Sequence, residues 1–308
     1  MMKSEIIELI DTIILPENGF IFKEFKDVFW GKDSNGNIVF GLISEENTKT
    51  LIEATKSLSL LLNIECAVET DKQTTIKKMN IIVLKNISYL DLFIRLTIVF
   101  INNKTNYSFL KFFLNMKELF GIEGKTDRNE LQGLFGELYT LCYFKEVLKK
   151  DISDFYQSMS KLKFDFSLSD VKKMEVKTTL KEERIHHFRN EQLNILRYDI
   201  KVVSILLQKD DKGLSLFLLI EKCKTLFSNN LTILVNIERI IRNWDENDLA
   251  SMSFNEKYLL NHIRVYDSCV IPRITEKNQN GVFNVEYDSN LSQSAFLDSE
   301  NILEWIEQ

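Results

Sequence analysis

The sequence has few of the residues that interrupt, loosen or cross-link a chain. Among its 308 residues are 2 prolines, 10 glycines and 4 cysteines. So little proline and glycine excludes collagen-like and proline-rich chains, and so little cysteine excludes a small disulfide scaffold. With 44% of its residues hydrophobic, the chain can bury a large core, as one large domain or as two of ordinary size.

The four cysteines also lack the spacing of a metal or redox motif. Cys66, Cys142, Cys223 and Cys269 stand far apart, with no CxxC pair and no Cys/His ligand pattern. This excludes zinc fingers and thioredoxin-like redox motifs. Isolated cysteines are typical of proteins in a reducing compartment, so we expect the protein in the cytoplasm.

No segment has the pattern of a signal peptide or of a membrane span. Glu5 and Glu8 stand where a signal peptide would be basic and then apolar. The most apolar stretch, residues 87–101, is interrupted by Asp91 and Arg95 and is too short to cross a bilayer. We therefore expect a soluble protein without a membrane partner.

Charge is distributed unevenly along the chain. The formal net charge of −6 excludes a globally basic nucleic-acid coat protein. Residues 145–201 nevertheless hold 13 basic and 10 acidic residues, so the acidic excess lies outside this central segment. This distribution is compatible with a central segment that approaches DNA, although a charged loop is usually only solvated.

The first part of the chain has the pattern of an α/β module. Strands are predicted at residues 19–29 and 37–43, around a turn-rich stretch. Helical spacing of apolar residues predicts helices at 46–62 and 108–120. The polar, glycine-containing stretch 121–129 follows, and we place a domain boundary there.

The middle part alternates between helix and strand, which favours a mixed sheet flanked by helices. After it we expect mainly helix to residue 262. The predicted domains are an accessory domain (1–121), a core (122–222) and an extension packed on the core (223–308). The predicted elements are helices at 131–150, 189–197 and 301–307, and strands at 163–168, 173–179, 199–208, 213–220, 263–271 and 281–287.

One apparent motif is a false lead. Gly124-Lys125-Thr126 resembles the end of a phosphate-binding P-loop, but Leu119 stands where that motif requires glycine. The preceding segment also has the pattern of a helix rather than a strand. We interpret this segment as a polar linker that ends the helix.

A stronger signal is the pair Glu175 and Lys177. Side chains alternate across a strand, so these two share one face of the strand 173–179 while Val176 points to the other. Taken alone, such a pair is most often a solvated sheet surface.

Asp165 changes that interpretation, because it stands between Phe164 and Phe166 on the preceding strand. The short connection predicts a hairpin, which would bring Asp165 near Glu175 and Lys177. Two carboxylates brought together repel unless a cation joins them. Oxygen ligands of this kind suit Mg²⁺ or Mn²⁺.

Glu137 adds a third acid. It lies within the apolar stripe of the helix 131–150, between Leu134 and Leu141. Gly133 and Gly136 on this helix weaken it, which indicates a close approach to another part of the chain. The alternative is an ordinary glutamate near a helix N-terminus.

Together these residues carry a family resemblance. The sequence resembles the bacterial PD-(D/E)XK motif nuclease family of the restriction-endonuclease-like superfamily, over about residues 131–207. Phe164 replaces the proline of the superfamily name, a common departure. The motifs are Gly133-Leu134-Phe135-Gly136-Glu137-Leu138, Phe164-Asp165-Phe166, Glu175-Val176-Lys177-Thr178-Thr179, His186-His187-Phe188 and Glu191-Gln192-Leu193.

The resemblance implies an α/β fold with a restriction-endonuclease-like core, an N-terminal α/β domain and a C-terminal, mostly helical extension. It also implies a Mg²⁺-dependent DNA endonuclease, with Mn²⁺ as a substitute. Asp165, Glu175 and the carbonyl of Val176 would bind the metal, and Glu137 would bind it through water or hold a second ion. Lys177 would orient the attacking water and stabilise charge on the phosphate.

Further candidates follow from the same resemblance. Gln192 would contact the metal-bound water or a phosphate; the alternative is a solvent-facing amide. His186 and His187 lack the spacing of a zinc site and either contact phosphate or pack locally, with His187 the stronger candidate. The basic residues that could line an approach for DNA are Lys172, Lys173, Lys181, Arg184 and Arg189.

Members of this family are typically encoded in restriction-like phage-defence clusters. The implied partners are DNA and proteins of such clusters, namely a methyltransferase, an ATPase and a Z1-type protein; a homo-oligomer is also compatible. Two other interpretations stay open. One is a nuclease fold that binds DNA or partner proteins with little cleavage. The other is a structural α/β protein with a chance match, in which Asp165 and Glu175 would lie far apart.

Overall fold

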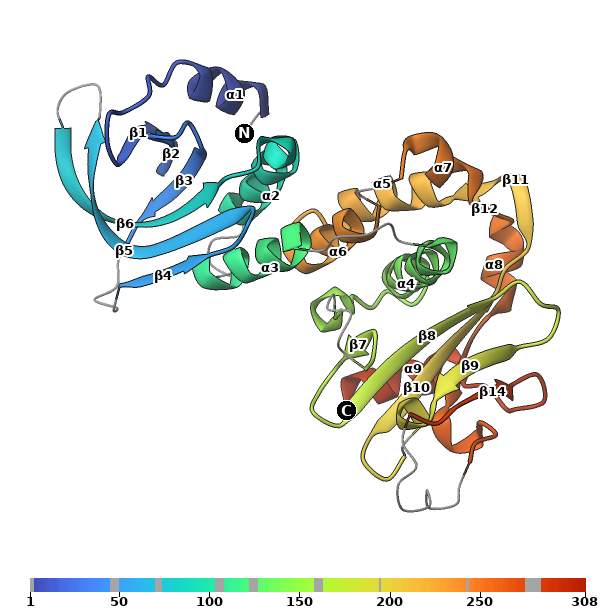
Figure 1. Ribbon diagram of the computed structural model, residues 1–308. Helices are drawn as coiled ribbons and strands as arrows, with labels where there is room; N and C mark the ends of the chain where they lie inside the picture. Colours follow the sequence, from blue (N-terminus) through green and yellow to red (C-terminus); the bar gives the residue numbers. More distant parts are fainter. Residues whose placement is uncertain are drawn as a thin grey trace. The chain divides into compact units, whose positions relative to one another are not determined.

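The chain folds into two compact units, residues 1–124 and 125–308 (Figure 1). They are described separately, in a computed structural model. The residues it describes are 3–44, 50–69, 74–102, 108–121, 127–157, 163–193, 195–241, 244–274 and 284–308. The Gly124-Lys125-Thr126 segment therefore lies outside the described residues.

The first unit is built on one antiparallel sheet with the strand order β1-β2-β3-β6-β5-β4. Its strands are β1 (Phe20–Phe25), β2 (Val28–Asp33), β3 (Ile38–Ile43), β4 (Leu51–Ala54), β5 (Leu58–Glu69) and β6 (Thr74–Leu84). Its helices are α1 (Lys3–Asp11), η1 (Ile87–Tyr89), α2 (Leu90–Asn102) and α3 (Phe109–Gly121). Aromatic residues such as Trp30, Phe40 and Phe100 fill its interior.

The helix predicted at 46–62 is wrong for the residues the structure describes. Residues 51–62 instead form β4 and the start of β5, and 45–49 lie outside the described residues. Apolar residues such as Leu58 and Leu61 match helical spacing, but β5 pairs with β6 over nearly its whole length. Pairing with the next strand along the chain outweighs local spacing here. The predicted helix at 108–120 is confirmed as α3.

The second unit is built around a mixed sheet with the order β13-β10-β8-β7. β8 and β10 are parallel, whereas β7 and β13 are antiparallel to their neighbours. The strands of this sheet are β7 (Phe166–Ser167), β8 (Lys172–Thr179), β10 (Asp199–Leu206) and β13 (Ile263–Asp267). Two smaller pairings are β9 (Ile185–Arg189) with β14 (Glu286–Asn290) and β11 (Lys209–Ser215) with β12 (Ser253–Phe254).

Helix α4 (Arg128–Glu146) lies along one face of this sheet (Figure 1). It begins where the Asp127 carboxylate accepts a 2.8 Å hydrogen bond from the Glu130 N–H, an N-cap that satisfies a first-turn donor. Leu134 and Leu138 of α4 join Val203 and Ile205 of β10 in one buried core. The remaining helices are η2 (Ser153–Phe155), η3 (Asn190–Leu193), α5 (Leu216–Leu226), α6 (Leu231–Ile241), α7 (Glu246–Ser251), α8 (Glu256–His262), η4 (Ser268–Val270) and α9 (Ser299–Glu307).

Two predicted elements of this unit are wrong. The strand predicted at 213–220 ends at Ser215, whose hydroxyl accepts from the Leu218 N–H at 3.2 Å and begins α5. The apolar run that follows is therefore a buried helix rather than a strand, and apolar runs of this length fit either. The short helix predicted at 189–197 is mostly absent, since Arg189 ends β9 and only the single turn η3 follows.

The C-terminal segment adds β13 to the mixed sheet and β14 to the pairing with β9. β13 confirms the first part of the strand predicted at 263–271, which ends at Asp267 and is followed by the single turn η4. α9 confirms the terminal helix. β14 starts at Glu286, later than the strand predicted at 281–287, of which residues 281–283 lie outside the described residues. Residues 223–308 therefore share one compact unit with the core.

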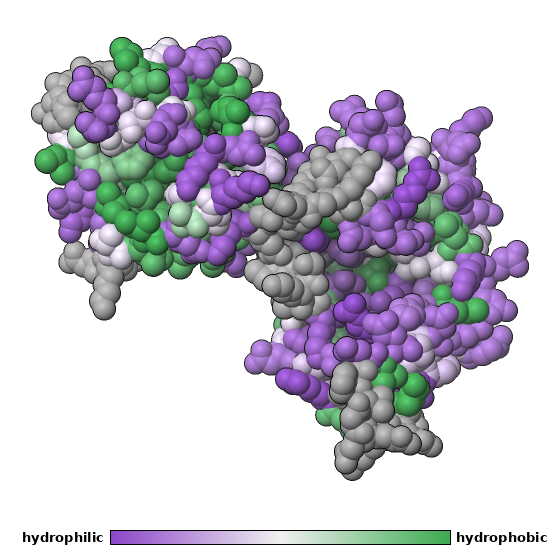
Figure 2. Space-filling model, viewed as in Figure 1, coloured by the Kyte–Doolittle hydropathy of each residue, from purple (hydrophilic) through white to green (hydrophobic). Residues whose placement is uncertain are grey.

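The two units differ in surface character. Figure 2 shows hydrophilic residues over most of the visible surface of the second unit, and hydrophobic patches on the first. Ile14, Ile52 and Ile76 of the first unit are 81%, 64% and 78% exposed. No helix among the described residues is long and apolar enough to cross a membrane.

Candidate metal and catalytic site

The predicted hairpin is confirmed and brings Asp165 beside the Glu175-Val176-Lys177 segment. β7 pairs with β8 so that Phe166 lies opposite Met174. Because β7 has only two residues, the edge of β8 beyond this point has no strand beside it in the described part of the chain. Asp165 occupies that place, and its Oδ2 accepts a 2.7 Å hydrogen bond from the Val176 N–H.

The two faces of β8 at this point have different roles. Val176 and Thr178 face α4 at Gly136, where a Cβ would lie 3.3 Å from Val176 Cγ1 and would collide with Thr178 Cγ2. Glu175 and Lys177 therefore point to the opposite face. The N–H and C=O of one strand residue point to the same edge, so the Val176 carbonyl also faces the Asp165 side.

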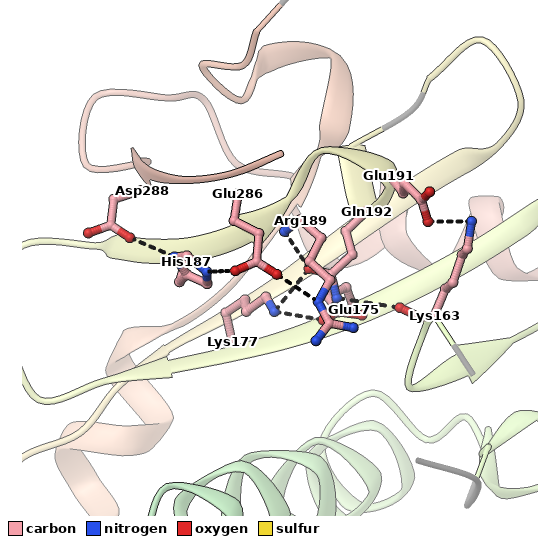
Figure 3. A network of polar contacts seen from close by, with 9 residues as sticks. All are labelled: Lys163, Glu175, Lys177, His187, Arg189, Glu191, Gln192, Glu286 and Asp288. Atoms are coloured by element: carbon pink, nitrogen blue, oxygen red, sulfur yellow. Dashed lines mark hydrogen bonds and ion pairs between the residues drawn. The ribbon is translucent and has the colours of Figure 1, made fainter. Parts of the chain in front are cut away.

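Glu175 is part of the polar network in Figure 3. It is 4% exposed. Its Oε1 lies 2.7 Å from Lys177 Nζ and accepts a 2.6 Å hydrogen bond from Gln192 Nε2. Lys177 Nζ also lies 5.4 Å from the centre of the Phe188 ring, which borders the site.

Gln192 reaches this network from the single turn η3. Its Oε1 accepts from the Arg189 backbone N–H at 3.1 Å and lies 3.4 Å from Lys177 Nζ. The amide therefore contacts both charged groups of β8 at once. The structure thus places Gln192 inside the site rather than in solvent, although the turn that carries it is not the helix expected from the sequence.

Glu137 approaches the same edge from α4. Its Oε2 accepts a 2.5 Å hydrogen bond from the hydroxyl of Tyr156. Its charge interacts with those of Glu175 and Lys177, and Asp165 interacts with both acids. The three acids therefore come from three directions: α4, the strand edge, and the far face of β8.

Burial and mutual repulsion raise the pKa values of these three acids. Burial raises the pKa of Glu137 to about 7, with a further rise from Glu175 and a counteracting hydrogen bond from Tyr156. Burial, and then the charges of Glu175 and Glu137, hold the pKa of Asp165 well above its ordinary value. Burial also raises the pKa of Glu175, against the opposing effect of Lys177. Such a cluster is unfavourable when its carboxylates are ionised and no cation lies between them.

The donor set fits a hard divalent cation. Glu175 Oε2 is buried and has no hydrogen-bond partner among the described residues, which is costly unless something binds it. Carboxylate and carbonyl oxygens are the ligands that Mg²⁺ and Mn²⁺ prefer. Among the residues described, however, no three acidic, cysteine or histidine side chains already converge as a closed metal site. Asp165, Glu175 and the Val176 carbonyl could hold such an ion, with Glu137 beside them.

Three residues of this region could not be found by motif. Tyr156, Asn236 and Arg239 connect to Glu137 through hydrogen bonds. Asn236 gave the only local signal, since it is a polar residue inside the apolar run of α6. Tyr156 precedes Asp165 by a segment without any recognisable pattern.

Among the basic candidates, His187 and Arg189 are exposed but already face carboxylates of β14 (Figure 3). The His187 ring nitrogens lie 3.1 Å from Asp288 Oδ1 and 3.2 Å from Glu286 Oε2, and these acids raise its pKa. Arg189 Nε donates to Glu286 at 3.2 Å. The paired acids reduce the net positive potential here.

The expectation that Arg184 and Lys172 line a DNA approach is not supported by their placement. Arg184 is 2% exposed and donates to Ser204 and to the His262 carbonyl, which ties β9 to its neighbours. Lys172 Nζ donates to the Trp305 carbonyl at 2.8 Å and so holds α9. Lys181, in contrast, is exposed to solvent.

His186 likewise packs inside. Its Nε2 lies 2.7 Å from Ser204 Oγ, and burial lowers its pKa to about 3. A neutral, buried imidazole is not a phosphate ligand. Of the two adjacent histidines, only His187 is exposed.

A cavity of about 330 Å³ lies elsewhere in the second unit. It is lined by residues from the start of α4, from β11 and β12 and from around α7, among them Gln132, Lys209 and Trp244. None of the acids described above lines it. The candidate site is thus a strand edge rather than this cavity.

Comparison with known families gives a match over most of the chain. A family model described as "Putative PD-(D/E)XK family member (DUF4420)" matches residues 21–292. The chain belongs to this family. The restriction-endonuclease-like α/β fold of a PD-(D/E)XK protein, predicted from the motifs, is thereby confirmed. Comparisons with curated proteins and with solved structures gave no match.

Membership places this chain among PD-(D/E)XK proteins, whose nucleases generally use divalent metals. Asp165 contacts the strand that carries Glu175 and Lys177 directly, through the N–H of Val176. The interpretation as a chance match required Asp165 and Glu175 to lie far apart. Their proximity and the family match both contradict it.

Proposed function

We propose that this PD-(D/E)XK protein is a metal-dependent DNA endonuclease. One observation carries the proposal: the charges of Glu137, Asp165, Glu175 and Lys177 interact with one another around the part of β8 that no other strand among the described residues covers. Within the same residues, buried Glu175 Oε2 has no hydrogen-bond partner. Buried oxygens of structural ion-pair networks are as a rule hydrogen-bonded. In a metal site, a carboxylate oxygen that binds the cation needs no hydrogen-bond partner.

Each residue has a role that follows from its position. Asp165, Glu175 and the Val176 carbonyl would hold Mg²⁺ or Mn²⁺, and Glu137 would hold it through water or hold a second ion. A bound cation lowers the pKa of its water and offsets charge on the phosphate. Lys177, 2.7 Å from Glu175, is placed to orient the attacking water and to stabilise the pentacoordinate phosphate. Gln192, which contacts both Lys177 and Glu175, would hold these two side chains in place.

We also propose that the nuclease acts in a restriction-like phage-defence system, with a methyltransferase, an ATPase and a Z1-type protein as partners. This part of the proposal follows from the resemblance to nucleases encoded in such clusters.

The experiment is plasmid cleavage with Mg²⁺ or Mn²⁺ by the wild type, Asp165→Ala and Lys177→Ala. Asp170→Ala is the matched control, because Asp170 is an exposed acid at the turn of the same hairpin. We expect the first two variants to lose at least ~100-fold and Asp170→Ala to keep full activity. Equal residual cleavage in every variant would mean a contaminating nuclease, and would favour a module that binds DNA or partners without cutting.

A further inference from the structure

Glu137 is the end of a chain of hydrogen bonds that begins on α6. Arg239 donates to Asn236 Oδ1, with Nη2 at 2.6 Å and Nε at 3.2 Å. Asn236 Nδ2 donates to the hydroxyl oxygen of Tyr156. The Tyr156 hydroxyl in turn donates to Glu137 Oε2 at 2.5 Å.

The chain has a fixed direction. An arginine can only donate, so the oxygen of the Asn236 amide must face Arg239 and its NH₂ must face Tyr156. That NH₂ occupies the hydroxyl oxygen of Tyr156 as acceptor, so the hydroxyl proton is left for Glu137. Each donor polarises the next, and the last acceptor is a carboxylate.

The members of the chain are held rigidly. Tyr156 is 3% exposed and Asn236 is 2% exposed. Tyr156 forms an isolated bridge with Phe166, and its ring packs on the Phe166 ring at 5.4 Å. The next residue, Gln157, donates its N–H to the Asp165 carbonyl at 2.8 Å. The same segment therefore lies against both Glu137 and Asp165.

We propose that Arg239, Asn236 and Tyr156 are positioning residues that hold the Glu137 carboxylate for the divalent cation. The inference rests on the proposed function, because it assumes a cation at this site. Tyr156 holds Oε2, and Oε1 forms no hydrogen bond within the described part of the chain, so Glu137 keeps one oxygen for the ion or its water. This series of hydrogen bonds links the metal site to α6, which lies outside the motif segments.

The test measures Mn²⁺ binding by electron paramagnetic resonance on the full-length protein. Tyr156→Phe deletes the donor to Glu137. Asn236→Asp reverses the chain, because a carboxylate cannot donate and would instead accept the Tyr156 proton while still pairing with Arg239. Both should weaken Mn²⁺ binding about 10- to 100-fold, the usual effect of removing a hydrogen bond behind a metal ligand. Both should also lower kcat on plasmid DNA, with KM little changed.

Two comparisons separate positioning from general structural damage. Tyr266→Phe removes another fully buried tyrosine hydroxyl, one without a hydrogen-bond partner among the described residues, and should leave Mn²⁺ binding unchanged. In a Glu137→Gln background, Tyr156→Phe should have no further effect, because the chain acts only through Glu137. Circular dichroism checks that each variant is folded.

The outcomes distinguish this proposal from the proposed function. If the wild type binds no Mn²⁺, the metal site itself is refuted and the positioning role with it. If the wild type binds Mn²⁺ and Glu137→Gln weakens it, but Asn236→Asp and Tyr156→Phe bind as the wild type does, only the positioning role is refuted. An equal effect of Tyr156→Phe with and without Glu137 would refute it too.

Discussion

Gly136 and Gly133 provide a sharp test of how α4 sits against β8. They lie three residues apart on the same helix, so the same substitution can be made at both positions. A Cβ at Gly136 would collide with Thr178 Cγ2, whereas a Cβ at Gly133 would meet nothing within 4 Å. We therefore compare Gly136→Ala with Gly133→Ala, which change the chain identically but in different surroundings.

The expected magnitudes follow from two effects. Replacing glycine by alanine inside a helix stabilises by about 1 kcal/mol, and both variants share this gain. Overpacking against a rigid neighbour costs about 1–3 kcal/mol, and only Gly136→Ala has this cost. The free energy of unfolding should therefore be about 1–3 kcal/mol lower for Gly136→Ala than for Gly133→Ala. For a unit of this size, that is a difference of roughly 2–12 °C in Tm.

The assay is thermal denaturation followed by circular dichroism, with plasmid cleavage on the same samples. Thr178→Ser removes the colliding methyl group but keeps the hydroxyl that accepts from Gln132 at 3.0 Å. Added to Gly136→Ala, it should restore most of the lost stability. Gly136→Ala should also lower cleavage about 10- to 100-fold, because it moves Glu137 relative to Glu175. Equal Tm values for the two alanine variants, or no rescue by Thr178→Ser, would refute this packing argument.

Three other predictions concern charge. Lys177→Met should reduce kcat about 100- to 1000-fold without weakening Mn²⁺ binding in a titration, and an unchanged kcat would contradict the role given to this lysine. Because burial raises the pKa of Glu137 from 4.5 to about 7, its protonated form stabilises the cation-free fold below about pH 5, and this contribution, on the order of 3 kcal/mol, is lost as the pH rises through 7. The increase in Tm on adding Mg²⁺ should therefore grow from pH 5 to pH 8; an increase independent of pH would be the contrary result. Finally, Lys181→Ala should weaken DNA binding a few-fold and reduce its salt dependence without changing Tm, whereas Arg184→Ala should lower Tm because it leaves Ser204 and the His262 carbonyl without their buried donor. A lower Tm for Lys181→Ala with unchanged DNA binding, or an unchanged Tm for Arg184→Ala, would contradict the placement of these two residues.

Much of the candidate site could be predicted because its signals are local. The hairpin between Asp165 and Glu175 follows from a short connection between two strands, and alternation along β8 places Glu175 and Lys177 on one face. Family resemblance also named Gln192, which does contact both. Predictions failed where a local pattern fitted two structures, as in the apolar runs of β5 and α5.

The sequence alone therefore determined which side chains of the motif are neighbours, because a hairpin and a strand's alternation are set within a few residues. Only the tertiary structure decided what surrounds them. It buried Arg184 beside Ser204 and brought β14 against His187. It also linked Glu137 through Tyr156 to Asn236 on α6. Such contacts join segments far apart in the chain, and no local propensity specifies which distant side chain fills a given place in a packed core.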